Sequence, residues 1–143
     1  MNQIITGGCL CGTIRYKCHD EPVFSGNCHC RDCQRTSGSA FAPAMFFQES
    51  VVEIIGDTKS YEAIADSGNK IWRLFCPNCG SQLFSKLQML PSMIGLRAGT
   101  LDDPSVFQPK MDMYTSSASH WDFMNPTLPK FKKGPTTETA HCQ

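Results

Sequence analysis

The sequence has no excess of charge of either sign. Its 13 Lys and Arg residues are matched by 13 Asp and Glu residues, so the formal net charge at pH 7 is zero. A neutral chain has no overall field to attract nucleic acid or an anionic membrane, and no basic stretch with interleaved aromatic residues is present to stack bases. We therefore expect neither nucleic acid nor a membrane as a partner.

Long apolar runs and long-period repeats are also missing. Residues 1–8 lack the basic and apolar segments of a signal peptide, and no later stretch approaches about 18 consecutive apolar residues. No period of roughly 20–50 residues recurs, which excludes solenoids and propellers. These absences predict a soluble, cytoplasmic protein.

The chain does contain enough apolar material for one core. Of its 143 residues, 41% are hydrophobic and 10% are aromatic. A chain of this length buries roughly 68–70% of the surface that it exposes when unfolded. We expect residues 1–129 to form a single domain, and the polar, pattern-free residues 130–143 to form a flexible C-terminal tail.

Cysteine is abundant. The chain has nine cysteines, an odd number, and a reducing compartment together with this length argues against a disulfide framework. Most of the cysteines fall in tight clusters, which is typical of metal ligands. They are Cys9, Cys11, Cys18, Cys28, Cys30, Cys33, Cys76, Cys79 and Cys142.

Two of the clusters complement each other. Zn²⁺ takes four ligands in a tetrahedron with Zn–S distances of about 2.3 Å, so two motifs with two thiolates each can complete one site. Cys9 and Cys11 would point to the same face of an extended strand. Gly80 lets the turn from Cys76 to Cys79 close with backbone amides facing the sulfurs. We predict that these four cysteines hold a structural zinc.

The third cluster supplies three thiolates, from Cys28, Cys30 and Cys33. Zinc with three protein ligands keeps a fourth position for water or substrate, the pattern of catalytic sites. We predict a second zinc here, which can be labile, and a catalytic role for all three cysteines. Three alternatives stay open: a fourth protein ligand would make the site structural, the thiols could be metal-free, or the clusters could share ligands. The candidate fourth ligands are Cys18, His19, His29 and Asp32.

Short segments that alternate apolar and polar residues between turn residues predict a mainly β protein. Residues 12–18 show this alternation clearly, and the longest helix-compatible stretch is only about 31–37, after the Cys-His-Cys motif. The other expected strands lie near residues 3–7, 23–28, 42–47, 51–55, 58–63, 71–75, 82–85, 93–97 and 110–115. This pattern favours a sandwich or barrel over a doubly wound sheet.

The three cysteine motifs, in this order, resemble the glutathione-dependent formaldehyde-activating enzyme (GFA) family, whose domain is shared with centromere protein V. The motifs are Gly7 to Tyr16 (GGCLCGTIRY), Cys28 to Gly38 (CHCRDCQRTSG) and Phe75 to Phe84 (FCPNCGSQLF). The resemblance implies a β-tent of antiparallel sheets around the structural zinc. It also implies a second zinc on the cysteines of the middle motif.

The resemblance further implies a reaction between formaldehyde and glutathione. Zinc held by three thiolates is a weak Lewis acid, better suited to binding a thiolate than to making hydroxide. We therefore expect a carbon–sulfur lyase-type enzyme in which a glutathione-like thiol, bound to zinc as a thiolate, reacts with a small aldehyde. The alternative is a non-enzymatic, zinc-stabilised module that binds a protein partner or a small thiol.

Some polar side chains near these motifs are expected to have structural roles. His29 alternates away from the face that carries Cys28 and Cys30. Arg73, beside Trp72, is interpreted as a side chain that covers the surface. The sequence identifies no residue as the proton shuttle.

Overall fold

The computed structural model describes residues 3–135, which form ten strands, one α-helix and four short 3-10 helices. The strands are β1 (Ile5–Gly8), β2 (Arg15–Cys18), β3 (Phe24–Cys28), β4 (Ala42–Gln48), β5 (Val52–Ile55), β6 (Lys59–Ile64), β7 (Lys70–Phe75), β8 (Gln82–Leu87), β9 (Leu90–Arg97) and β10 (Asp112–Met113). The helices are α1 (Arg31–Ser37), η1 (Glu49–Val51), η2 (Ala98–Thr100), η3 (Pro104–Val106) and η4 (Thr115–Ser117). The predicted mainly β fold, with a short helix after the Cys-His-Cys motif, is confirmed.

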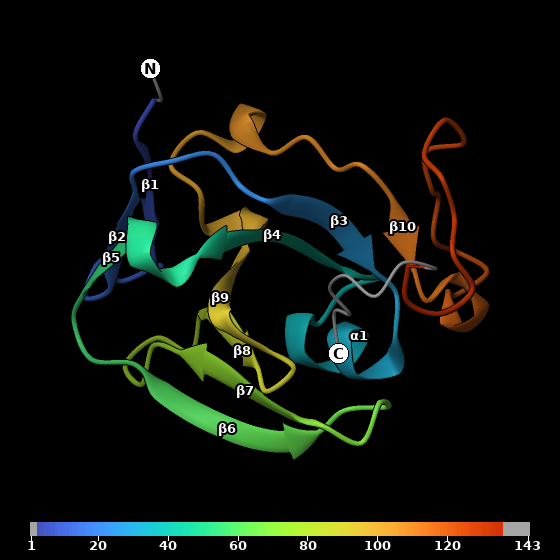
Figure 1. The fold of residues 1–143 in the computed structure, drawn as a ribbon, viewed down its shortest axis with the longest axis horizontal. Coiled ribbons are helices and arrows are strands. Elements are labelled where there is room, and N and C mark those ends of the chain that lie inside the picture. The colour runs from blue at the N-terminus through green and yellow to red at the C-terminus, as the bar shows by residue number, and fades with distance from the viewer. Residues whose placement is uncertain (1–2, 136–143) are drawn as a thin grey trace.

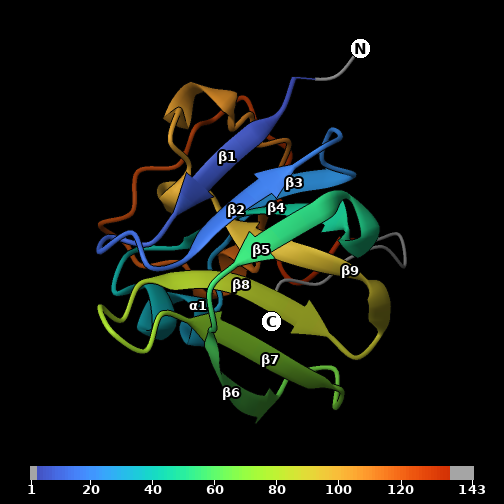
Figure 2. The same cartoon turned by 90° about the vertical axis from the view of Figure 1, so that its left-hand side faces the viewer.

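The strands form two sheets (Figure 1, Figure 2). The smaller sheet is antiparallel in the order β1-β2-β5, and the larger sheet has the order β10-β3-β4-β9-β8-β7-β6. The sequence predicted antiparallel sheets, but β10 runs parallel to β3, so the larger sheet is mixed. A parallel pair needs a long crossover connection, and the chain between β3 and β10, which includes six other strands, provides it.

The larger sheet carries an apolar cluster on each face. Successive side chains of a strand point to opposite faces, so Met45 and Phe47 of β4 join one cluster while Ala44 and Phe46 join the other. The first cluster also contains Cys9, Cys18 and Cys76, and the second contains Cys28, Cys30 and Cys33. The sheet therefore separates the two groups of clustered cysteines.

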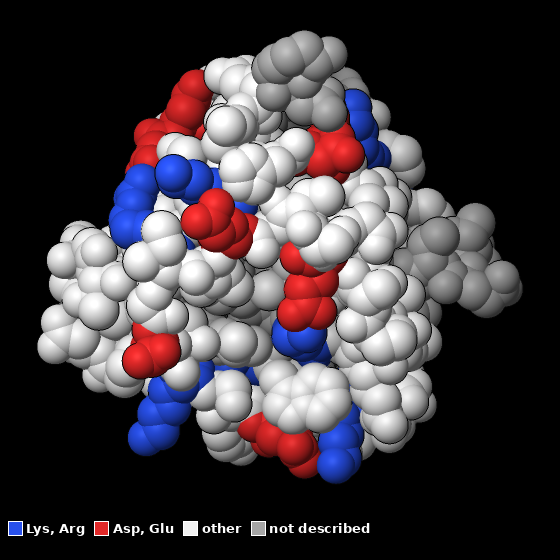
Figure 3. All heavy atoms as spheres, turned by 60° about the vertical axis from the view of Figure 1, so that its left-hand side comes forward, with Lys and Arg blue, Asp and Glu red and all other residues white. Residues whose placement is uncertain are grey.

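The surface has no segregated charge on the face that Figure 3 shows. Acidic and basic side chains lie interspersed there, without a large area of one sign. Within residues 3–135, no helix has the length and apolarity needed to span a membrane.

The segment 130–133, which the sequence assigned to a flexible tail, is part of the described fold. The Phe131 N–H donates to the Asp112 carbonyl at 2.9 Å, and the Tyr114 N–H donates to the Lys133 carbonyl at 2.9 Å. Backbone hydrogen bonds along β10 hold this segment, so it needs no apolar side-chain pattern that a sequence would reveal. The described fold therefore continues past the boundary predicted at residue 129, and residues 136–143 of the predicted tail lie outside the described residues.

Candidate metal centres and the cavity at Cys30

The structure brings the sulfur atoms of Cys9, Cys11, Cys76 and Cys79 within 4.8 Å of one another. The Sγ atoms of Cys9 and Cys11 lie 3.6 Å apart, and those of Cys11 and Cys76 lie 3.8 Å apart. In a tetrahedral zinc site with Zn–S distances of about 2.3 Å, neighbouring sulfurs are about 3.8 Å apart. This group, the Cys9 cluster, could therefore hold a metal ion with four cysteine ligands.

A turn, and not the expected strand, brings Cys9 and Cys11 together. Both residues lie in the connection between β1 and β2. The Cys9 N–H donates to the Ile14 carbonyl at 3.0 Å, the Gly12 N–H donates to the Cys9 carbonyl at 3.2 Å, and Gly12 has φ +84°. A left-handed residue bends the loop, and glycine adopts this conformation without steric cost. The convergence of the two sulfurs therefore depends on the loop and not on strand alternation.

Backbone amides point at the sulfurs of the Cys9 cluster. The Ile14 N–H donates to Cys9 Sγ at 3.2 Å. The N–H groups of Asn78 and Cys79 lie 3.4 and 3.5 Å from Cys76 Sγ, which accepts from both. Such donors stabilise negative charge on sulfur, and four thiolates around one divalent ion leave an excess of negative charge.

Side-chain hydroxyls also favour the thiolate form in this cluster. Hydrogen bonds with Ser81 are the main cause that lowers the pKa of Cys79 to about 5. Hydrogen bonds with Thr13 are the main cause that lowers the pKa of Cys11 to about 7. The thiolate is the form that ligates a metal, and at neutral pH these values make Cys79 mainly a thiolate and Cys11 partly one.

The second group, the Cys28 cluster, contains Cys28, Cys30 and Cys33, whose sulfurs also lie within 4.8 Å of one another and are buried. Cys28 ends β3, Cys30 is the N-cap residue of α1, and Cys33 lies in the first turn of this helix. The Cys33 N–H donates to Cys30 Sγ at 3.2 Å. The strand end and the helix start therefore converge on one point.

The Cys28 cluster needs positive charge to hold three thiolates. A hydrogen bond with Cys28 is the largest influence on Cys30 and lowers its pKa, but the contact with Cys33 and burial together outweigh it and raise the pKa to about 11. Without a cation, Cys30 thus remains a thiol at neutral pH. A metal ion supplies the charge that deprotonates coordinating thiols, so this donor set fits zinc.

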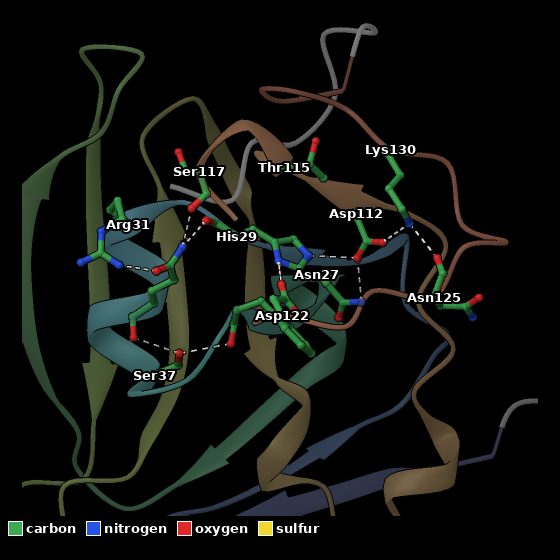
Figure 4. A network of polar contacts seen from close by, with 12 residues as sticks. Asn27, His29, Arg31, Ser37, Asp112, Thr115, Ser117, Asp122, Asn125 and Lys130 are labelled. Atoms are coloured by element: carbon green, nitrogen blue, oxygen red, sulfur yellow. Dashed lines mark hydrogen bonds and ion pairs between the residues drawn. The ribbon is translucent and has the colours of Figure 1, made fainter. Parts of the chain in front are cut away.

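Beneath the Cys28 cluster lies a buried charged network that the sequence did not reveal (Figure 4). His29 Nε2 lies 3.0 Å from Asp112 Oδ1, and His29 Nδ1 lies 2.7 Å from Asp122 Oδ2. All three side chains are at most 3% exposed. Each ring nitrogen therefore lies close to a carboxylate oxygen, although the Nδ1 contact lacks the geometry of a hydrogen bond. His29 thus has the structural position expected from its alternation, but with partners far away in the sequence.

Asp112 connects this network to the end of the described chain. Its Oδ2 accepts from Lys130 Nζ at 2.7 Å, and its Oδ1 accepts from Asn27 Nδ2 at 3.2 Å. Burial raises the pKa of Asp112, but the bonds from Lys130, His29 and Asn27 outweigh it, and the pKa lies below its ordinary value. One buried carboxylate therefore links His29 to Lys130.

Gln34 ties α1 to the same region. Its Nε2 donates to the His29 carbonyl at 2.7 Å and to the Ser117 carbonyl at 3.0 Å, while its Oε1 accepts from Arg31. Figure 4 shows Arg31 and Ser117, two of these partners, on the helix side of His29. The network and Gln34 together fix the Cys28 cluster against the segment that follows β10.

A cavity of about 320 Å³ opens at Cys30. It is lined by Cys30, Arg31, Asp32, Ile64, Ala65, Asp66, Tyr114, Ser117 and Lys133. Tyr114 has φ +56°, and it is the one non-glycine residue with positive φ among residues 3–135. A side chain held in this sparsely populated conformation often belongs to a functional site. Sequence reasoning missed Tyr114 because no local pattern marks a strained backbone.

Arg73 differs from its expected surface role. The side chain is 3% exposed, and its Nε and Nη2 atoms are buried without a hydrogen-bond partner. The alternation of β7 places Arg73 on the inward face with Ile71, while Trp72 points to the other face. The position of a charged residue on the inward face of a strand is the signal that could have identified Arg73 as buried.

Comparisons with known proteins concern both the sequence and the fold of the chain. The sequence pattern of the glutathione-dependent formaldehyde-activating enzymes matches residues 4–117. A crystal structure of a Rhodobacter sphaeroides protein is similar in fold, with a TM-score of 0.55 and 18% identity over 88% of this chain and 98% of that chain. No curated protein matches the sequence. The extent of the first match shows that the chain belongs to the GFA family.

Proposed function

We propose that the protein is a zinc-dependent carbon–sulfur lyase-type enzyme that acts on a glutathione-like thiol and a small aldehyde such as formaldehyde. The observation that carries this proposal is the position of the Cys28 cluster: three thiols converge at a point where Cys30 lines a cavity of about 320 Å³. Three protein ligands beside a cavity are typical of catalytic zinc, whereas four cysteines, as in the Cys9 cluster, are typical of structural zinc.

The charges around the cavity suit a zwitterionic thiol. Arg31 and Lys133 contribute positive charge, and Asp32 and Asp66 contribute negative charge. Glutathione carries carboxylates and an ammonium group, so it can form ion pairs with both kinds of side chain. The lining therefore supports a peptide-like thiol over a purely apolar one.

The proposed reaction needs no oxidant or reductant. The thiol sulfur forms a bond to the aldehyde carbon, the π electrons of the C=O bond move to the oxygen, and this oxygen takes up a proton while the thiol loses one. Zinc, when bound, lowers the pKa of the substrate thiol. Tyr114, which is 6% exposed and lines the cavity with Cys30, is our candidate for proton transfer at the aldehyde oxygen.

Tyr114→Phe is expected to lower kcat about 100-fold, because it removes the proton donor while it keeps the ring that lines the cavity. The KM for the thiol should change little. Steady-state kinetics with reduced glutathione and formaldehyde measure both values. Tyr61→Phe is the control, since Tyr61 on β6 is 66% exposed and away from the cavity. A full kcat in Tyr114→Phe would remove Tyr114 from the mechanism.

Cys30→Ser tests the proposal as a whole. Elemental analysis should show zinc falling from two ions per chain to one, and turnover of glutathione with formaldehyde should be lost. Circular dichroism should show that the β structure is retained, because the Cys9 cluster lies on the other face of the larger sheet. Turnover that persists in the variant at unchanged zinc content would contradict the proposal.

Thermal unfolding with and without glutathione separates the proposed enzyme from the binding module. A thiol that binds the folded state raises the midpoint by mass action. Stabilisation of the wild-type protein without any aldehyde-dependent turnover would identify a thiol-binding module instead of an enzyme.

A further inference from the structure

A second and larger cavity, of about 520 Å³, lies between α1 and the ends of β8 and β9. Thr36 from α1, Gln82 from β8, Arg97 from β9 and Thr100 line it together with serines, glycines and aromatic or proline side chains. Neither cysteine cluster contributes a residue to it. Arg97 is the one charged side chain in the described lining, and so the cavity has a net positive charge.

Arg97 lacks an acidic partner. The side chain is 8% exposed, its Nη2 makes a long hydrogen bond of 3.4 Å to Thr36 Oγ1, and its buried Nη1 has no hydrogen-bond partner. No carboxylate of the described residues forms an ion pair with it. A buried charge without a counter-charge is expensive, and such a group calls for an explanation such as a bound ion or ligand.

An acceptor in the same cavity is also unsatisfied. Gln82 Oε1 is buried without a hydrogen-bond partner. A ligand that satisfies both groups must therefore bring an acceptor with negative charge for Arg97 and an N–H or O–H donor for Gln82. A carboxylate with a donor on a neighbouring atom, as in an N-acyl amino acid, has both.

The surroundings strengthen the positive potential. Arg73 pairs in register with Ser85, and Ser85 pairs with Gly95, two residues before Arg97 on β9. By strand alternation Arg73 and Arg97 therefore lie on the same face of the larger sheet. Both have buried guanidinium nitrogens without partners. Arg73 does not line the cavity, so its charge adds to the positive potential on this face while Arg97 alone is placed to pair with a bound anion.

We propose that this cavity is a binding site for a carboxylate, in which the Arg97 guanidinium pairs with the carboxylate and Gln82 accepts a hydrogen bond from the adjacent donor. The site stands independently of the proposed lyase reaction. The carboxylate can belong to a free small acid or to one arm of a thiol substrate. Both sources share the chemistry that Arg97 recognises.

Calorimetric titration of the full chain with N-acetylglycine, at constant ionic strength, tests the proposal. Arg97→Met should weaken binding at least about tenfold, because a charge-assisted hydrogen bond is lost. The ligand-free Arg97→Met protein should unfold at the same or a higher temperature than wild type, since the substitution removes an unpaired buried charge. Arg35→Met is the control, because Arg35 is exposed on α1.

Three further results decide the proposal. Gln82→Leu should lower the affinity for N-acetylglycine to the affinity for propionate, which lacks the N–H donor.

Glutathione titration identifies the source of the carboxylate. If Arg97→Met weakens glutathione binding, the carboxylate belongs to a thiol substrate. If Arg97→Met leaves glutathione binding unaffected, the carboxylate belongs to a separate small acid. Unchanged N-acetylglycine binding in Arg97→Met, equal stabilisation of wild type by chloride, or unfolding of ligand-free Arg97→Met would each overturn the site.

Discussion

His29→Ala is expected to lower the free energy of unfolding by about 3–5 kcal/mol. The substitution removes the ring that lies within 3.0 Å of one buried carboxylate and 2.7 Å of another, so Asp112 and Asp122 lose the polar partner that they share. Lys130 still pairs with Asp112, but no other ion pair to Asp122 occurs among residues 3–135. Urea unfolding, followed by far-UV circular dichroism, measures the loss.

His19→Ala is the matched control for this prediction. His19 also pairs with a carboxylate, that of Glu53 at 3.3 Å, but the two side chains are 47% and 56% exposed. An exposed pair of this kind contributes about 0–1 kcal/mol. If His29→Ala cost no more than His19→Ala, the buried network would not be a stabilising element.

Cys76→Ser is expected to remove zinc from the Cys9 cluster and to prevent the chain from folding stably. Structural zinc contributes on the order of 10–16 kcal/mol of apparent binding free energy in small zinc domains, which exceeds the net stability of a typical domain. Cys76 is fully buried in the apolar cluster that also contains Cys9. Zinc content and the thermal unfolding midpoint of the purified variant measure the effect.

Cys18→Ala provides the comparison for Cys76→Ser. Cys18 is equally buried in the same apolar cluster but lies outside the Cys9 cluster and the Cys28 cluster. Its substitution should keep both zinc ions and lower stability only by the small amount that one lost sulfur atom costs. A Cys76→Ser protein that behaved like Cys18→Ala would show that the fold does not depend on metal at this cluster.

The sequence was informative where the signal is local. The ten strands and the short helix followed from period-two alternation and turn residues, and the cysteine groups followed from their spacing. The loop geometry of Cys9 and Cys11 did not follow from the sequence. Strand alternation and a turn bent at a glycine both bring side chains at positions i and i+2 together. Local pattern alone does not separate these two causes.

The network around His29 was beyond local reasoning for a different reason. Its carboxylates stand 83 residues or more further along the chain, and nothing near Asp112 or Asp122 marks them as partners of a histidine. Arg73 was less hidden. It lies at an inward position of β7, as its alternation with Ile71 predicts, whereas residues 93–97 of β9 are all buried, so alternation does not single out Arg97.

The position of Lys130 has a consequence for how the protein is made. The family pattern ends at residue 117, whereas His29 and Asp112 rely on charges at positions 122 and 130. During synthesis both cysteine clusters therefore leave the ribosome well before Asp122 and Lys130, the later partners of His29 and Asp112. A nascent chain that has reached only the end of the family pattern holds both cysteine clusters but not yet Asp122 and Lys130, so residues made later complete the contacts of the buried network next to the Cys28 cluster.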